Sequence, residues 1–118
     1  MVPVGGTRPG VSQLRRGVLQ FCVLALLRDG EKYAFELVRE LCDAHGLVTS
    51  EGTIYPLLSR LRKEELVSTS WRESETGPPR RYYSLTPTGH QALADFAAEW
   101  APFRTAVDQL LEIGENHG

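Results

Sequence analysis

Apolar residues recur at intervals of three and four along much of the chain, which is the period of an α-helix. The pattern predicts one helix over residues 12–29, capped by Ser12, and a second over residues 33–44, each followed by a glycine that ends it. The first is apolar around most of its circumference, so we expect more than one neighbour to bury it. The apolar positions of the two helices are Leu14, Val18, Leu19, Cys22, Val23, Leu26, Leu27, Phe35, Leu37, Val38, Leu41 and Cys42.

A shorter amphipathic helix is predicted after Ser50, which is a candidate N-cap. Its core positions fall at i, i+3, i+4 and i+7, and they are Ile54, Leu57, Leu58 and Leu61. Its polar face carries hydroxyls and cations that can donate to phosphates and base edges, namely Thr53, Tyr55, Ser59, Arg60 and Lys63. An ordinary solvated face is the alternative. Because Pro56 lacks a backbone donor and presses on Gly52, we expect a bent or late first turn.

The next residues alternate as two strands around a turn, over residues 66–74, 75–79 and 80–86. Alternation places Tyr82 and Tyr83 on opposite faces, so one is expected to be core, and Trp71 is expected to anchor the hairpin to the helices. Three arginines of this hairpin are candidate contacts to a nucleic-acid backbone, namely Arg72, Arg80 and Arg81. A polar helix followed by a basic hairpin is the order of a winged helix-turn-helix, in which the hairpin is the wing.

A long C-terminal helix is predicted over residues 87–113, with Thr86 or Thr88 as its cap and Pro102 as a kink. Its apolar stripe consists of Leu93, Phe96, Ala97, Trp100, Val107, Leu110 and Leu111. The stripe is too long for so small a domain to cover, so a second copy of the helix is expected to pack on it. The predicted fold is mainly α with a small β-hairpin. It comprises a disordered arm (residues 1–11), a winged helix-turn-helix (12–86), a dimerisation helix (87–113) and a tail (114–118).

Composition fits one globular domain, since the 118 residues are 42% hydrophobic and 24% charged. The chain contains no apolar run long enough to span a bilayer and no signal peptide, and its two cysteines fit reduced thiols in a cytoplasm. The net charge of −2 divides unevenly: residues 1–81 hold 12 Lys and Arg against 10 Asp and Glu (+2), and residues 82–118 hold 1 against 5 (−4). The acidic charge therefore lies away from the predicted DNA-reading elements.

Other chemistries find little support in the sequence. The residues form no nucleophile elbow, phosphate loop or paired-acid motif, so the chain is not expected to be an enzyme or to hold a cofactor. Cys42 and His45 stand one turn apart, but zinc needs about four ligands and no other pair has ligand spacing, so no metal site is expected. The alternatives left open are a metal-responsive repressor and a protein-binding module that docks through Tyr55 and the long helix.

Two motifs carry a resemblance to a known family. One is G52-T-I-Y-P-L-L-S-R-L, with a Tyr-Pro step inside the helix; the other is W71-R-E-S-E-T-G-P-P-R-R-Y-Y-S-L-T-P-T-G89. Together they are similar to the PadR family of bacterial transcriptional regulators, and the resemblance extends over residues 14–111. It implies a homodimer that binds a pseudo-palindromic double-stranded DNA operator, represses transcription and is released by a small molecule. The short end of the chain after a single C-terminal helix resembles the smaller branch of the family, which includes multidrug-responsive repressors.

The resemblance also implies an effector site, because the short multidrug-responsive members hold flat aromatic ligands between two tryptophans, one from each subunit. The matching residue here is Trp100, and Phe96 and Glu99 beside it complete the expected site for a planar aromatic effector. A core tryptophan that seals the interface is the alternative. The expected dimer contacts are Leu93, Ala97, Phe103, Val107, Leu110 and Leu111.

Overall fold

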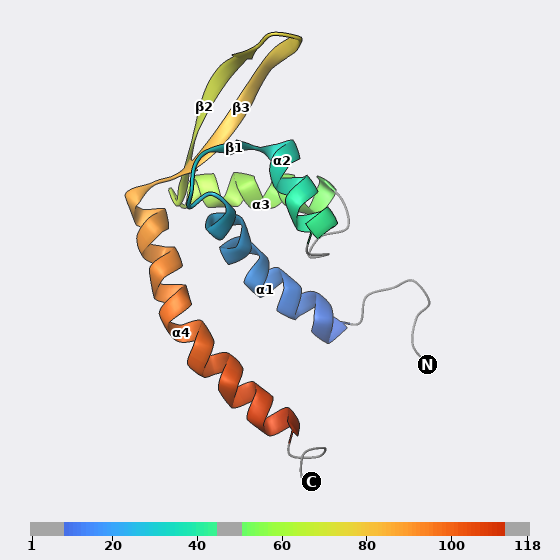
Figure 1. Ribbon diagram of the computed structural model, residues 1–118, viewed down its shortest axis with the longest axis vertical. Coiled ribbons are helices and arrows are strands. Elements are labelled where there is room, and N and C mark those ends of the chain that lie inside the picture. The colour runs from blue at the N-terminus through green and yellow to red at the C-terminus, as the bar shows by residue number, and fades with distance from the viewer. Residues whose placement is uncertain (1–8, 45–50, 113–118) are drawn as a thin grey trace.

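Helix α1 (Pro9–Leu26) opens the computed structural model, which describes residues 9–44 and 51–112 (Figure 1). The helix begins and ends earlier than predicted. Ser12 lies inside it and is not its cap, and the first turn starts with a proline, whose missing N–H is not needed there. The chain then turns at Gly30, whose φ of +153° strains residues that carry a side chain.

A short strand and a second helix follow. Strand β1 (Lys32–Tyr33) was not predicted from the sequence, and α2 (Ala34–Arg39) continues into the π-helical turn η1 (Glu40–Ala44). The backbone N–H of Tyr33 donates to the Glu36 carboxylate at 3.0 Å, which satisfies a donor at the start of α2. The predicted helix end at His45 and Gly46 and the cap at Ser50 lie outside the described residues.

Helix α3 (Glu51–Lys63) runs through Pro56 without a break. Its predicted core face is confirmed, because Ile54, Leu58 and Leu61 are fully buried. The helix is closed by a turn at Glu65, whose φ of +62° is left-handed. This conformation lets the backbone N–H of Leu66 donate to the Leu61 carbonyl at 3.0 Å, which is the closure of a Schellman motif.

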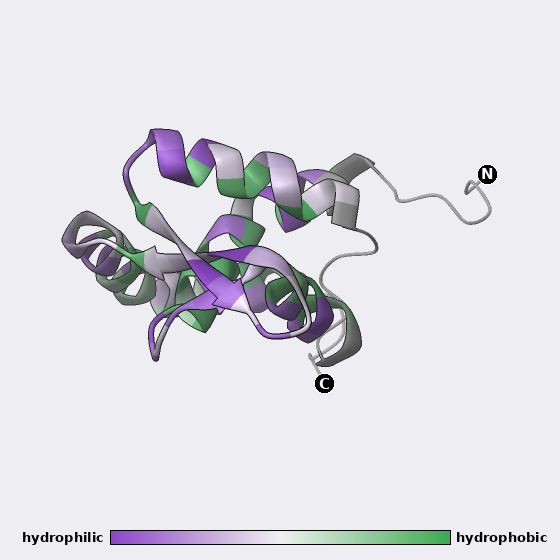
Figure 2. Ribbon diagram, turned by 90° about the horizontal axis from the view of Figure 1, so that it is seen from above, coloured by the Kyte–Doolittle hydropathy of each residue, from purple (hydrophilic) through white to green (hydrophobic). Residues whose placement is uncertain are grey.

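Strands β2 (Val67–Ser74) and β3 (Gly77–Leu85) form the wing, and the antiparallel sheet has the order β1-β3-β2. The wing projects beyond the helices (Figure 1), and the view from above shows that most of it is hydrophilic (Figure 2). The turn is shorter than the predicted 75–79, because Pro78 and Pro79 belong to β3. They fit there because β1 pairs only with Tyr82 and Tyr83, so their missing N–H groups remove no bond to β1.

Helix α4 (Pro87–Glu112) continues through Pro102 and runs away from the wing (Figure 1). Thr86 is its cap, as predicted: the hydroxyl oxygen accepts from the N–H of Gly89 at 2.9 Å and its proton goes to the carbonyl of Glu65, 2.7 Å away. Thr86 therefore joins the start of α4 to the turn that ends α3.

One hydrophobic core lies where α1, α2, α3 and the base of the sheet meet. Among the described residues its fully buried large side chains are Val23, Leu24, Leu37, Leu41, Ile54, Leu58, Leu61 and Val67. Tyr83 is 7% exposed and belongs to this core, whereas Tyr82 is half-buried on the opposite face, so the predicted split of the two tyrosines is confirmed. The predicted fold class is also confirmed, with β1 as an addition. Within residues 9–44 and 51–112, no helix is both long and apolar enough to cross a membrane.

Candidate nucleic-acid interface

The outer surface of α3 is divided into two flanks. Tyr55, Ser59 and Arg62 stand at i, i+4 and i+7, so they share one exposed flank, with Lys63 beside them. We call these four residues the reading flank. Tyr55 is 47% exposed although it is aromatic, so the core does not use it. Arg62 is not among the residues predicted from the sequence, and its helical spacing from Tyr55 is the signal that identifies it.

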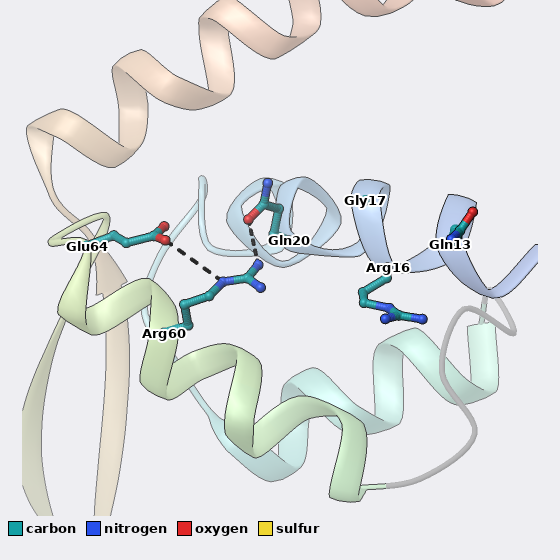
Figure 3. A pocket seen from close by; sticks show the side chains of 6 residues that line it. All are labelled: Gln13, Arg16, Gly17, Gln20, Arg60 and Glu64. Carbon is teal, nitrogen blue, oxygen red and sulfur yellow. Dashed lines mark hydrogen bonds and ion pairs between the residues drawn. The ribbon is translucent and has the colours of Figure 1, made fainter.

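Arg60 lies on the other flank and is turned toward α1 (Figure 3). An Nη atom of Arg60 donates to Oε1 of Gln20 at 2.8 Å, and its Nε lies 3.9 Å from a carboxylate oxygen of Glu64. Thr53 shares this flank because it precedes Arg60 by seven positions. A hollow of about 470 Å³ lies here between α1 and α3, lined by Gln13, Arg16, Gly17, Gln20, Arg60 and Glu64. The predicted polar face is therefore split between two surroundings.

Two of the predicted wing arginines share one face of the sheet. Arg72 and Arg80 are directly opposite each other on β2 and β3. The guanidinium carbon of Arg72 lies 4.9 Å from the ring centre of Tyr82, and that of Arg80 lies 4.5 Å from the ring centre of Tyr33. Arg72 also forms an ion pair with Glu31, which precedes β1. Both guanidinium groups are therefore supported by neighbouring side chains.

The third wing arginine, Arg81, lies on the opposite face of the sheet, paired in register with Trp71. Its guanidinium carbon is 4.9 Å from the centre of the Trp71 rings. The expectation that Trp71 anchors the wing to the helices is wrong, because Trp71 is 63% exposed. Trp71 shares a face of the sheet with Val67, but the wing has already passed beyond the helices at this point.

Aromatic side chains form a row from α1 along α4. Phe21 stacks on Phe96 with ring centres 4.1 Å apart, Phe96 lies 5.6 Å from Trp100, and Trp100 lies 6.2 Å from Phe103. We call these four residues the aromatic row. Glu99 is exposed beside it. The row brings the predicted effector residues Phe96 and Trp100 together on one face of α4.

The predicted dimer residues differ in how much surface they leave for a partner. Leu93 is only 7% exposed and already belongs to the core of its own chain. Phe103, Leu110 and Leu111 are 59%, 70% and 70% exposed, and Ala97 and Val107 are also exposed. The second half of α4 is therefore the part of the stripe that a partner would cover.

In the described part of the chain, no group of three or more His, Cys, Asp or Glu side chains is arranged to bind a metal ion. Cys42 is half-buried against the core, and His45 lies outside the described residues. Burial raises the pKa of the Cys22 thiol above its usual value. That thiol therefore stays protonated near neutral pH and is a weak nucleophile.

Comparison with known proteins agrees with the resemblance found in the sequence. Residues 23–95 match the model of the transcriptional regulator PadR-like family. A solved PadR-like transcriptional regulator from Bacillus cereus is 38% identical, with a TM-score of 0.76, over 85% of this chain and 97% of that chain. The negative transcriptional regulator PadR of Bacillus subtilis is 28% identical over 97 residues, which cover 80% of this chain and 53% of that protein. A structure of Bacillus subtilis PadR with operator DNA is also 28% identical and has a TM-score of 0.63, covering 68% of this chain and 45% of that one. By sequence and by fold, this chain belongs to the PadR-like family of transcriptional regulators.

Proposed function

We propose that this protein is a homodimeric repressor that binds a pseudo-palindromic DNA operator. The observation that carries the proposal is the exposed reading flank of α3 beside a projecting wing that displays three arginines. A helix of this kind fits the major groove, and a wing reaches the adjacent backbone or minor groove. The PadR structure with operator DNA supports a DNA partner, and the name of that relative, a negative regulator, supports repression.

The residues divide between reading bases and holding the backbone. We assign base reading to the reading flank, with Arg62 joining the residues predicted from the sequence, and phosphate or minor-groove contacts to the wing arginines. Thr53 and Arg60 border the groove from the flank that faces α1. Arg60 reaches a base edge only after it leaves Gln20.

The distribution of charge supports the same orientation. Asp95, Glu99, Asp108 and Glu112 all lie on α4, which runs away from the wing. DNA docked against α3 and the wing would therefore lie away from these carboxylates. The cations of α3 and the wing would supply the electrostatic part of the binding free energy. The overall charge of −2 is thus compatible with DNA binding.

The first prediction distinguishes residues that read bases from residues that contact the DNA backbone. It uses an operator obtained by unbiased selection from random DNA. We expect Arg62→Ala to cost about 1–3 kcal/mol on the operator and to relax preference at one base position in each half-site. Arg81→Ala should weaken all sequences alike and reduce the slope of log affinity against log salt by about one for each phosphate that the variant no longer neutralises. Fluorescence anisotropy at several salt concentrations measures both effects.

The outcomes have different meanings. If both variants bind like the parent, the assignment of the groove-facing surface is wrong. If the parent retains no DNA from the selection at moderate salt, the DNA role itself fails. A protein-binding module that docks through Tyr55 and α4 then becomes the better interpretation.

We further propose that a planar aromatic cation is the effector and that it binds at Trp100 between the two subunits. Trp100 lies within the aromatic row, and the carboxylates of Asp95 and Glu99 stand on the same helix. A flat ring can stack on an indole, and nearby acids favour a positive charge. Release from DNA would follow if the ligand bound preferentially to a dimer whose reading helices no longer match the operator spacing.

The second prediction tests this site with ethidium as the probe. We expect ethidium to quench the fluorescence of Trp100 in a Trp71→Phe background, where Trp100 is the single tryptophan. In the parent, Trp100→Ala should abolish ethidium binding while the dimer and its operator affinity largely persist. If Trp100→Ala unfolds the protein, or if ethidium binding survives the substitution, Trp100 is a core residue and the effector site lies elsewhere.

A further inference from the structure

Two tyrosines on adjacent strands form a platform under two arginines of the wing. Tyr33 on β1 and Tyr82 on β3 are directly paired, with ring centres 5.4 Å apart and planes inclined by 59°. We call this pair the tyrosine shelf. Arg72 and Arg80 lie over its two rings, one guanidinium on each. The four side chains thus occupy one face of the sheet and come from all three strands.

The position of the two arginines needs an explanation, because like charges directly opposite each other destabilise a sheet. Arg72 and Arg80 form such a pair. Each leans diagonally onto a ring of the neighbouring strand, where the negative face of the aromatic ring attracts the cation. The shelf therefore offsets the repulsion and also limits the rotamers of two long side chains.

Glu31 adds a third contact to this arrangement. Its carboxylate pairs with Arg72, whereas Arg80 has no carboxylate partner among the ion pairs of the described residues. Arg72 must cross over Tyr82 to reach Glu31, because β3 lies between β2 and β1. The Arg72 side chain is 59% exposed, so an external anion can approach it. The site thus contains two guanidinium cations, and the carboxylate of Glu31 is paired with one of them, Arg72.

We propose that Tyr33 and Tyr82 are positioning residues that hold Arg72 and Arg80 as a two-point clamp for a DNA backbone phosphate, and that the phosphate replaces Glu31 on Arg72. This inference rests on the proposed DNA-binding function and specifies its wing contact. Two guanidinium groups fixed on one face suit a phosphate, which presents several acceptor oxygens. Prior ordering by the shelf reduces the entropy that binding would otherwise cost.

The test compares Tyr33→Leu and Tyr82→Leu with the matched variants Tyr33→Phe and Tyr82→Phe, which keep the ring. Neither substitution changes the net charge. We expect each leucine variant to bind selected DNA about tenfold more weakly, since a dimer carries two clamps, and the phenylalanine variants to bind like the parent. The slope of log affinity against log salt should become shallower by about one to two in the leucine variants alone. If the salt slope changes although the net charge of the protein does not, a phosphate is no longer held. A lower stability of the fold does not by itself change this slope.

Glu31→Gln should change DNA affinity in the direction opposite to that of the leucine variants. Removing the internal anion frees Arg72, so we expect about two- to tenfold tighter DNA binding and a steeper salt slope. If Glu31 were needed only for structure, its removal would weaken binding. Weaker binding by Glu31→Gln, or an unchanged salt slope in both leucine variants, overturns the clamp.

A measurement without DNA keeps the shelf testable if a leucine variant is unstable. In the parent, the side-chain protons of Arg72 and Arg80 should show upfield NMR shifts from the rings, and these shifts should persist in the phenylalanine variants. Their absence from the parent spectrum overturns the shelf. If the parent shows the shifts but retains no DNA in the selection, the proposed function fails and the clamp fails with it. If the parent binds DNA and only the predicted changes in slope are missing, the clamp alone is wrong.

Discussion

Replacing Gly89 by alanine is expected to lower the free energy of unfolding by about 3 kcal/mol or more, although alanine is the better helix former. A Cβ at this position would overlap the carbonyl oxygen of Leu66 and would lie 3.1 Å from a methyl carbon of Leu85. The carbonyl cannot easily move, because it accepts the N–H of Thr86 at 3.2 Å. Urea unfolding at one fixed protein concentration measures the decrease.

Gly17→Ala is the matched control, because it makes the same substitution within another helix. An added Cβ at Gly17 meets no atom within 4 Å. The higher helix propensity of alanine should therefore raise the free energy of unfolding by about 0.5–1 kcal/mol. If Gly89→Ala is as stable as Gly17→Ala, the close approach of α4 to the end of α3 is not a constraint. The opposite signs of the two effects would show that Gly89 is required by the contact and not by the helix.

Periodicity was sufficient to predict the helices and the core face of α3. Buried apolar residues recur with the helical period wherever a helix rests on a core, so Ile54, Leu58 and Leu61 could be predicted as buried without a structure. Strand β1 could not be found in the same way. Two residues contain no alternation, and Lys32 and Tyr33 form a strand only because β3 lies beside them.

The error at Trp71 shows what a strand pattern cannot specify. Alternation fixes the face on which a side chain lies, and Val67 and Trp71 do share a face. Burial depends on what covers that face: Val67 is 2% exposed over the helices, and Trp71 is 63% exposed where the wing extends beyond them. The length of the projection is a property of the tertiary arrangement.

The candidate site shows a similar limit. A helical wheel identifies the polar side of α3, but it does not say which neighbour stands beside each flank. Only the packing of α1 shows that Arg60 is held by Gln20, and only the sheet order shows that Arg72 can reach Glu31 across β3. The residues that position the cations come from segments far apart in the sequence, so no local pattern contains them.

The largest effect on assembly is expected from placing charge in the apolar stripe of α4. Leu110→Glu combined with Leu111→Glu should convert the proposed dimer to monomers or aggregates at micromolar concentration. Both side chains are 70% exposed in the isolated chain and would be buried by the partner helix, where an unpaired carboxylate is strongly unfavourable. Operator affinity should fall about 100-fold or more, because two linked reading helices gain from a high effective concentration that separate ones lack.

Thr105→Glu combined with Gln109→Glu is the control for this variant. These two residues are exposed on the opposite side of the same helix, so the double substitution adds the same charge without entering the stripe. Sedimentation equilibrium and anisotropy on the selected operator should show a dimer with an affinity near that of the parent, apart from a modest effect of the added charge. A stable monomer of the Leu110 and Leu111 variant that binds the operator like the parent would refute dimerisation through α4. An equal decrease in both double variants would assign the effect to charge and not to the stripe.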